Sequence, residues 1–142
     1  MVRKMTDRYE SPLPTRYASK EMTSLFSQDT RYRTWRRLWA VLARTEKELG
    51  LPITDEQVSE LFAHTDNIDY ELVRQREKEG RPDVRAHGWA YGKAAPSAAG
   101  IIHLGATSCY VTDNADLIIY RDALALVRKE LREWLAAFSQ SR

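Results

Sequence analysis

The chain has 142 residues, enough for one domain with a buried core, and its 43% hydrophobic and 30% charged residues are ordinary for a globular protein. The formal net charge of +2 gives no reason to expect nucleic acid or a membrane surface as a partner. A single cysteine excludes an intrachain disulfide, and no apolar run could span a bilayer or serve as a signal peptide, so we expect a cytoplasmic protein.

The N-terminal residues 1–18 are predicted to form an extended arm. They are mostly polar, and Pro12 and Pro14 argue against a helix. Ser19 is then a good N-cap for a short helix over residues 20–26.

A longer helix is predicted from Thr30 to about Leu49, ended by Gly50. Its apolar residues recur at steps of three and four, as on one buried helix face: Trp35, Leu38, Trp39, Leu42 and Leu49. Residues 31–37 are rich in arginine and aromatic residues, a composition that also occurs in nucleic-acid patches. Because Trp35 belongs to the apolar face, we interpret these arginines as a solvated helix face.

Three shorter helices are expected next, over residues 55–63, 70–79 and 83–95. Thr54 and Gln57 have the spacing of a capping box at the start of the first. The third contains several small residues, which permit close approach of another backbone or a ligand.

The last helix is predicted from Asp113 to about Ser139, with its start signal at Thr112–Asn114. Large apolar residues repeat along it at alternating steps of three and four, as in a helical bundle: Leu117, Tyr120, Leu124, Val127, Leu131, Trp134 and Phe138. We call this set the α-helical seam and interpret it as a surface for partner helices. The chain is predicted to be all-α, divided into an arm (1–18), a helical domain (19–111) and the start of a bundle helix (112–142).

Residues 100–114 combine an apolar lead-in, a break at Gly105 and two adjacent hydroxyls, Thr107 and Ser108, before the last helix. Such a turn can present backbone N–H groups and hydroxyls to an anion. An ordinary connection between two helices is the alternative.

The histidines offer few chemical candidates. His87 follows Asp83 at the i, i+4 spacing, so the carboxylate could orient the imidazole and raise its pKa for acid–base work. A structural hydrogen bond is the alternative, and His103, between two apolar residues, is expected to be partly buried and satisfied. No metal site is expected, because histidine and cysteine pairs are lacking. Cys109 is expected to pack as a small apolar residue.

Four segments together resemble the N-terminal region of adenylosuccinate lyase, in the fumarase/aspartase superfamily. The most specific is Ala98–Ile119, which contains the sequence GIIHLGATSCYVTDNADLI, and the others are residues 11–19, 34–39 and 48–56. The resemblance covers roughly residues 9–139.

This resemblance implies an enzyme of purine nucleotide biosynthesis that needs no metal or organic cofactor. The implied reaction is β-elimination of fumarate from adenylosuccinate, giving AMP, and from SAICAR, giving AICAR. The implied architecture is three helical domains in a homotetramer, built on a central helical bundle, with active sites shared between subunits. The partners expected for this chain are therefore a purine-nucleotide substrate and further copies of the chain.

By resemblance, substrate-binding residues can be assigned to three parts of the ligand: Arg16 and Tyr17 to the phosphate end, Arg81 and Asp83 to the pocket, and Thr107 and Ser108 to a succinyl carboxylate. No catalytic residue is expected within the chain, although His87 is retained as an auxiliary candidate.

Two departures from the family pattern bear on activity. Pro82 stands at a substrate-contacting histidine position, and Trp89 stands where many relatives carry a histidine. In the family, the catalytic histidine and serine both lie in later domains without a counterpart here. We therefore expect the 142-residue chain to be inactive alone. A non-catalytic helical binding or assembly module derived from the lyase is the alternative function.

Overall fold

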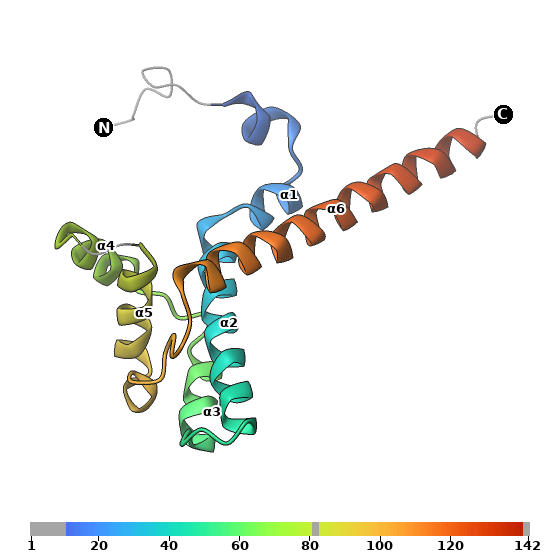
Figure 1. Cartoon of the computed structure of the whole chain (residues 1–142). Helices are drawn as coiled ribbons and strands as arrows, with labels where there is room; N and C mark the ends of the chain where they lie inside the picture. Colours follow the sequence, from blue (N-terminus) through green and yellow to red (C-terminus); the bar gives the residue numbers. More distant parts are fainter. Residues whose placement is uncertain (1–10, 81–82, 141–142) are drawn as a thin grey trace.

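In the computed structural model, which describes residues 11–80 and 83–140, every regular element is a helix (Figure 1). This confirms the all-α prediction. The central helix α2 contacts α1, α3, α5 and α6, while α4 packs on α5. The α-helices are α1 (Lys20–Leu25), α2 (Gln28–Glu48), α3 (Asp55–Ala63), α4 (Tyr70–Lys78), α5 (Asp83–Ala94) and α6 (Ser108–Gln140). None of the described helices is both long and apolar enough to cross a membrane.

Aromatic side chains fill the core between α2, α3 and α5. Trp35 and Trp39 of α2 are buried, with their rings edge to face at 6.3 Å between centroids. Tyr91 of α5 is also buried, and its hydroxyl donates a hydrogen bond of 2.6 Å to the backbone oxygen of Leu61 in α3. Buried alanines complete the contact with α6, which approaches α2 through Val111 and its neighbours.

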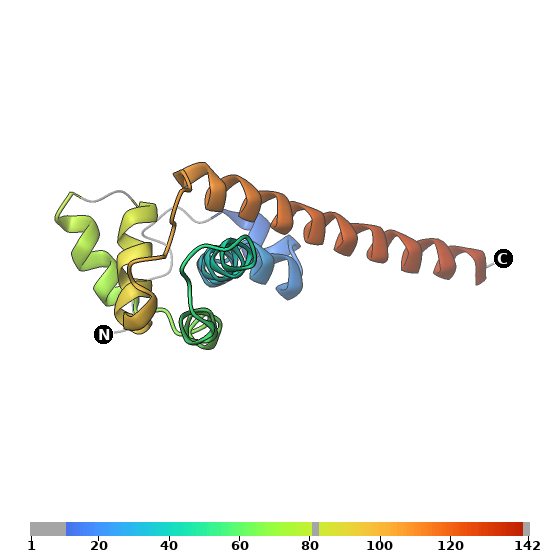
Figure 2. The ribbon, with the colours of Figure 1, turned by 60° about the horizontal axis from the view of Figure 1, so that its bottom comes forward.

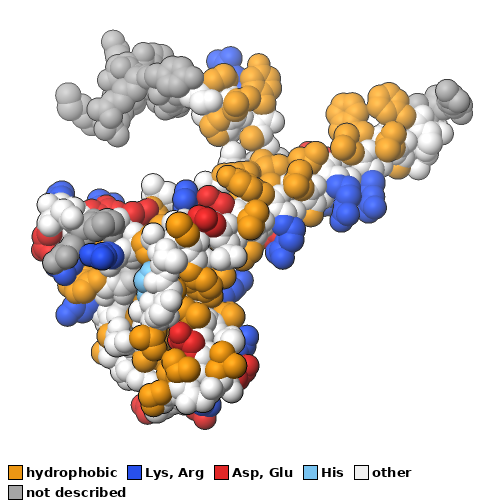
Figure 3. All heavy atoms as spheres, in the orientation of Figure 1, with side chains coloured by type: hydrophobic (Ala, Val, Ile, Leu, Met, Phe, Trp, Pro, Cys, Tyr) orange, Lys and Arg blue, Asp and Glu red, His pale blue; other side chains and the backbone are white. Residues whose placement is uncertain are grey.

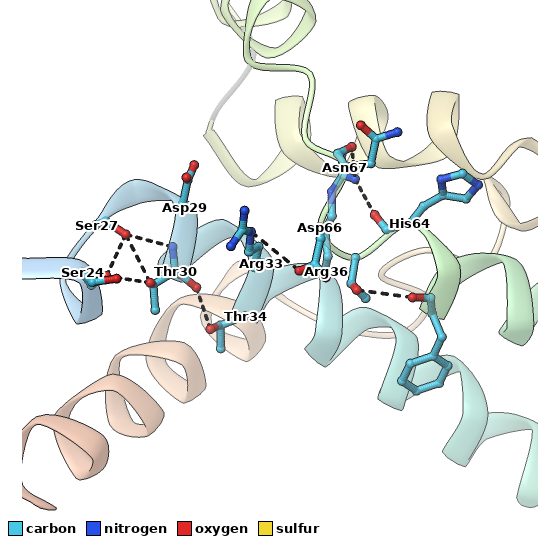
Figure 4. Close-up of polar contacts among 12 residues, drawn as sticks. Ser24, Ser27, Asp29, Thr30, Arg33, Thr34, Arg36, His64, Asp66 and Asn67 are labelled. Atoms are coloured by element: carbon cyan, nitrogen blue, oxygen red, sulfur yellow. Dashed lines mark hydrogen bonds and ion pairs between the residues drawn. The ribbon is translucent and has the colours of Figure 1, made fainter. Parts of the chain in front are cut away.

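Capping residues set the helix starts. Thr54 and Gln57 form the predicted capping box of α3. However, α2 begins two residues earlier than predicted, because Ser27 is its N-cap and accepts a hydrogen bond from the Thr30 N–H at 3.2 Å. The Thr30 hydroxyl instead donates to the Ser24 backbone oxygen at 2.7 Å, which ties α2 to the end of α1 (Figure 4).

Arg36 contradicts the interpretation of residues 31–37 as a solvated face. Its side chain is only 1% exposed, and its guanidinium lies 4.6 Å from the centre of the Tyr91 ring. One terminal nitrogen donates to the backbone oxygens of His64 and Asn67, both at 2.7 Å (Figure 4). The arginine therefore fastens the connection between α3 and α4 onto α2, and burial lowers its pKa.

The extended conformation predicted for the arm is wrong over Leu13–Tyr17, which form a short π-helical turn, η1. The prolines do not prevent it: Pro12 is its N-cap and Pro14 lies in its first turn, where a backbone N–H has no helical partner to lose. Residues 1–10 lie outside the described part of the chain. The division into three domains remains a prediction.

The last helix starts at Ser108, five residues before the predicted start. Residues 112–114 do not cap it, since their side chains bond within the helix. The Thr112 hydroxyl donates to the Ser108 backbone oxygen at 3.3 Å, and the Asn114 amide donates to the Tyr110 backbone oxygen at 2.7 Å. The C-terminal half of α6 projects away from the other helices in both ribbon views (Figures 1 and 2).

The α-helical seam is on the surface. Its residues from Leu117 to Trp134 are between 41% and 69% exposed, and hydrophobic side chains run along α6 (Figure 3). The residues of α6 that are buried in the chain lie on another face: Val111, Ala115, Ile119 and Ala123. Most of the large apolar face is thus exposed in the described chain, although the Tyr120 ring lies 6.3 Å from the ring of Phe26 at the end of α1.

Candidate functional site

A cavity of about 710 Å³ brings together three of the predicted site residues. Asp83 is the first residue of α5, and Thr107 and Ser108 stand at the start of α6. Other lining residues are Val84, Arg85, His103, Ala106 and Thr112. Two helix N-termini and several hydroxyls therefore face one space, an arrangement that suits an anionic group.

The turn that leads into α6 has an unusual backbone. Gly105 has a φ of +63° and His103 a φ of +66°, a left-handed conformation that is uncommon for a residue with a side chain. His103 is fixed there by a hydrogen bond of 2.9 Å from the Trp39 indole N–H to its Nδ1. Burial lowers the pKa of His103, which agrees with an unprotonated Nδ1 as acceptor. The prediction of a partly buried, satisfied histidine is confirmed.

His87 behaves differently from the sequence prediction. Its Nε2 lies 3.6 Å from an Asp83 carboxylate oxygen, yet burial and then the positive charge of Arg36 lower its pKa to about 4. The expectation that Asp83 raises this pKa is wrong, because desolvation of a side chain only 3% exposed outweighs the carboxylate. The ring stacks on Tyr32, with 3.7 Å between centroids. His87 is therefore a neutral, packed residue at pH 7.

One group of possible metal donors occurs in the part of the chain that the structure describes. Atoms of Glu77, Asp83 and His87 lie within 4.8 Å of one another, a proximity across α4 and α5 that sequence spacing did not reveal. Burial and the charge of Glu77 raise the pKa of Asp83. Exposed carboxylates commonly lie this close without an ion, so the group is not by itself a metal site.

The remaining predicted residues are not in the cavity. Arg16 and Tyr17 are exposed on η1, the turn that precedes α1 (Figure 1). Neither residue lines the cavity. Arg81 and Pro82 lie outside the described residues. The structure therefore brings Asp83 together with Thr107 and Ser108, but not with Arg16 and Tyr17.

Sequence reasoning missed Arg85 as a cavity residue. Arg85 lines both this cavity and an adjoining one of about 260 Å³ that contains Trp39 and Trp89. The sequence alone does not mark an arginine on an exposed helix face as a site residue, because its role depends on how the turn 103–108 packs beside it.

Cys109, which was expected to pack as a small apolar residue, is instead exposed.

Comparison with curated proteins gives the family. No family model matches the chain. It is 52% identical over 135 residues to an adenylosuccinate lyase of Schizosaccharomyces pombe, and 51% identical over 128 residues to one of Saccharomyces cerevisiae. These matches cover 93% and 88% of the chain.

The chain belongs to the adenylosuccinate lyase family. Its relatives include a protein of Caenorhabditis briggsae with 46% identity over 138 residues, which bears the same name. The chain spans just over a quarter of the length of these relatives, between 27% and 29%. The resemblance noted in the sequence is thus confirmed at the level of the family.

Proposed function

We propose that this chain provides one wall of an adenylosuccinate lyase active site, where Thr107 and Ser108 bind a carboxylate of the succinyl group. The reaction would be the β-elimination of fumarate from adenylosuccinate and from SAICAR in purine nucleotide biosynthesis. The observation that carries the proposal is the 710 Å³ cavity, which Asp83, Thr107 and Ser108 all line although Asp83 and Thr107 are 24 positions apart in the sequence.

The hydroxyls and the N-terminus of α6 support carboxylate binding. The Thr107 Oγ1 accepts a 3.3 Å hydrogen bond from the Cys109 N–H, which holds this side chain at the helix start. Ser108 forms no side-chain hydrogen bond within the described residues, so its hydroxyl is available to donate to an oxygen atom of a ligand. The positive end of the helix dipole adds a favourable interaction with negative charge.

The two histidines near this cavity, His87 and His103, are not suited to proton transfer. β-Elimination needs a base for the succinyl carbon and an acid for the departing nitrogen, and such groups each contribute about 10²–10⁴-fold. His87 is buried with a pKa of about 4, and the Nδ1 of His103 already accepts the Trp39 N–H. We therefore propose that the 142-residue chain binds substrate groups but does not catalyse the reaction alone.

Arg16 and Tyr17 are proposed to contact the nucleotide phosphate only in an assembled enzyme. Both side chains are exposed on η1, and neither reaches the cavity within one chain. The exposed residues Leu117–Trp134 of the α-helical seam support assembly into a homo-oligomer through α6, as in a family tetramer. We also propose a cytoplasmic location, in keeping with a single unpaired cysteine.

Fumarate binding tests the carboxylate site. Calorimetric titration of the chain with fumarate should give saturable binding, and replacing both hydroxyls (Thr107→Val with Ser108→Ala) should weaken it by about 10-fold or more, since two hydrogen bonds to a charged group are lost. Thr45→Val is the matched control, because the Thr45 hydroxyl bonds its own helix away from the cavity. Unchanged affinity in the double variant would contradict the proposed site.

A non-catalytic binding or assembly module is the second candidate function. It is favoured by the buried, neutral His87, by the engaged Nδ1 of His103 at the cavity, and by Pro82, which by resemblance stands where the family carries a histidine. Co-expression with an intact lyase distinguishes a contribution to the active site from a non-catalytic module. Incorporation of the chain into lyase oligomers without any change in turnover per intact subunit would favour the module.

A further inference from the structure

Arg85 lies where two cavities on one side of α5 meet. The 710 Å³ cavity and its 260 Å³ neighbour share the lining residues Val84, Arg85 and His103. The larger one extends to Thr107 and Ser108, and the smaller one to Trp39 and Trp89. A ligand group held beside the shared lining residues, in either cavity, would therefore lie next to Arg85.

Among the described residues that line the larger cavity, Arg85 is the only lysine or arginine. Asp83, the other charged residue that lines it, is directed to His87 at 3.6 Å and lies in the group with Glu77. Among residues 11–80 and 83–140, Arg85 takes part in no ion pair, hydrogen bond or cation–π contact, whereas the nearby Arg31 and Arg76 both pair with carboxylates. An exposed arginine with no internal partner can turn toward a ligand without breaking a native contact.

We infer that Arg85 is a substrate-binding residue that pairs with the carboxylate held at Thr107 and Ser108. The inference rests on the proposed function and adds a residue to that site. A guanidinium presents parallel N–H donors that match the two oxygens of a carboxylate, while the hydroxyls donate from the start of α6. Arg85 thereby supplies the positive charge that neither neutral histidine can provide at pH 7.

The charges of Arg85 and Asp83 also determine which anionic ligands the cavity favours. Asp83 lies on the same cavity wall and repels a second anion placed near it, so the favoured ligand puts one carboxylate between Arg85 and the hydroxyls. Phosphate also binds guanidinium groups, so the binding of phosphate and the binding of a carboxylate must be compared directly.

The test is an NMR titration of the ¹⁵N-labelled 142-residue chain with fumarate and, separately, with inorganic phosphate. The variants are Arg85→Gln, which removes the charge, and Arg85→Lys, which keeps it but loses the paired donors. Arg37→Gln is the matched control, since Arg37 is an exposed helical arginine that lines a different cavity, between α2 and α6. We expect fumarate to shift the amide signals of residues 103–108, with about 10-fold or greater weakening in Arg85→Gln, partial recovery in Arg85→Lys and no change in Arg37→Gln.

The outcomes separate the inference from the proposed function. Fumarate binding at residues 103–108 that is equally tight in wild type and Arg85→Gln would overturn the role of Arg85 and leave the carboxylate site intact. No binding to the wild-type chain would overturn both. Tighter, Arg85-dependent binding of phosphate than of fumarate would overturn the assignment of a carboxylate to this residue. Unchanged amide spectra of the free variants would show that each one is folded.

Discussion

The two halves of α6 share one helical pattern but have different surroundings. In the first half, the buried face is made of small or branched residues, Ala115, Ile119 and Ala123, and it packs on α2. In the second half, large residues such as Leu131 and Trp134 are more than half exposed, and no residue from Leu124 to Gln140 is buried. Alanines permit close approach of helices within the chain, whereas the large apolar face is suited to contact with other helices outside it.

The largest effect is expected in the core on which the first half of α6 rests. Trp39→Ala removes a buried indole and its hydrogen bond to His103, and should lower the free energy of unfolding by about 3–5 kcal/mol. Urea denaturation followed by circular dichroism measures it. Trp134→Ala, in the projecting half, is the matched control and should change stability by less than about 0.5 kcal/mol; equal losses would break the distinction between the two regions.

The buried His87 gives the core a pH dependence that the projecting helix lacks. Its pKa is about 4 in the folded chain, below the ordinary 6.5, so the unfolded chain takes up the proton first as the pH falls. The stability is therefore complete above about pH 7 and should decrease by up to about 3 kcal/mol between pH 6.5 and 4. Denaturation at several pH values measures this slope, and His87→Gln should reduce it. The same slope in both proteins would show that His87 is not its source.

A matched pair of alanine-to-leucine substitutions compares the packing of the two halves of α6 directly. Ala115→Leu adds three carbons to a fully buried position and should destabilise the chain by about 1–3 kcal/mol. Ala125→Leu makes the same change at an exposed position and should be nearly neutral. Thermal unfolding of both variants provides the measurement. A loss at Ala125 as large as that at Ala115 would mean that the second half is packed in the same chain.

The smallest effect on stability, but a clear effect on association, is expected at Leu131. Leu131→Lys places a charge in the exposed apolar face and should change the unfolding of the monomer by less than about 0.5 kcal/mol. It should shift sedimentation from oligomer to monomer, because a buried, unpaired lysine is strongly disfavoured at an interface. Gln140→Lys, at the end of α6, is the control for added charge. A wild-type chain that stays monomeric at high concentration would contradict association through this face.

The fold was largely predictable because local signals define its helices. The capping box at Thr54 and Gln57 and the turn before Tyr70 set α3 and α4 to within one residue. The start of α6 was misplaced because Thr112 and Asn114 resemble capping residues, although here they bond within the helix. The role of the prolines in η1 was missed because a short π-helical turn tolerates them at its start.

The site was only partly predictable, because its chemistry depends on contacts distant in sequence. The hydroxyls of Thr107 and Ser108 and their turn were found from local pattern, and the structure adds the wall from α5. The low pKa of His87 arises from burial and from Arg36, 51 residues away, which no local spacing reveals. The burial of Arg36 itself depends on carbonyls at His64 and Asn67.

The most direct test of the proposed function is to incubate the 142-residue chain with adenylosuccinate and to measure binding and fumarate release in the same sample. We expect saturable binding that Ser108→Ala weakens, and no fumarate above the level of a sample without protein. His87 is buried with a pKa of about 4, and the Nδ1 of His103, which lines the cavity, already accepts the Trp39 N–H. Sustained fumarate release by the chain, or binding that is absent altogether, would contradict the proposal.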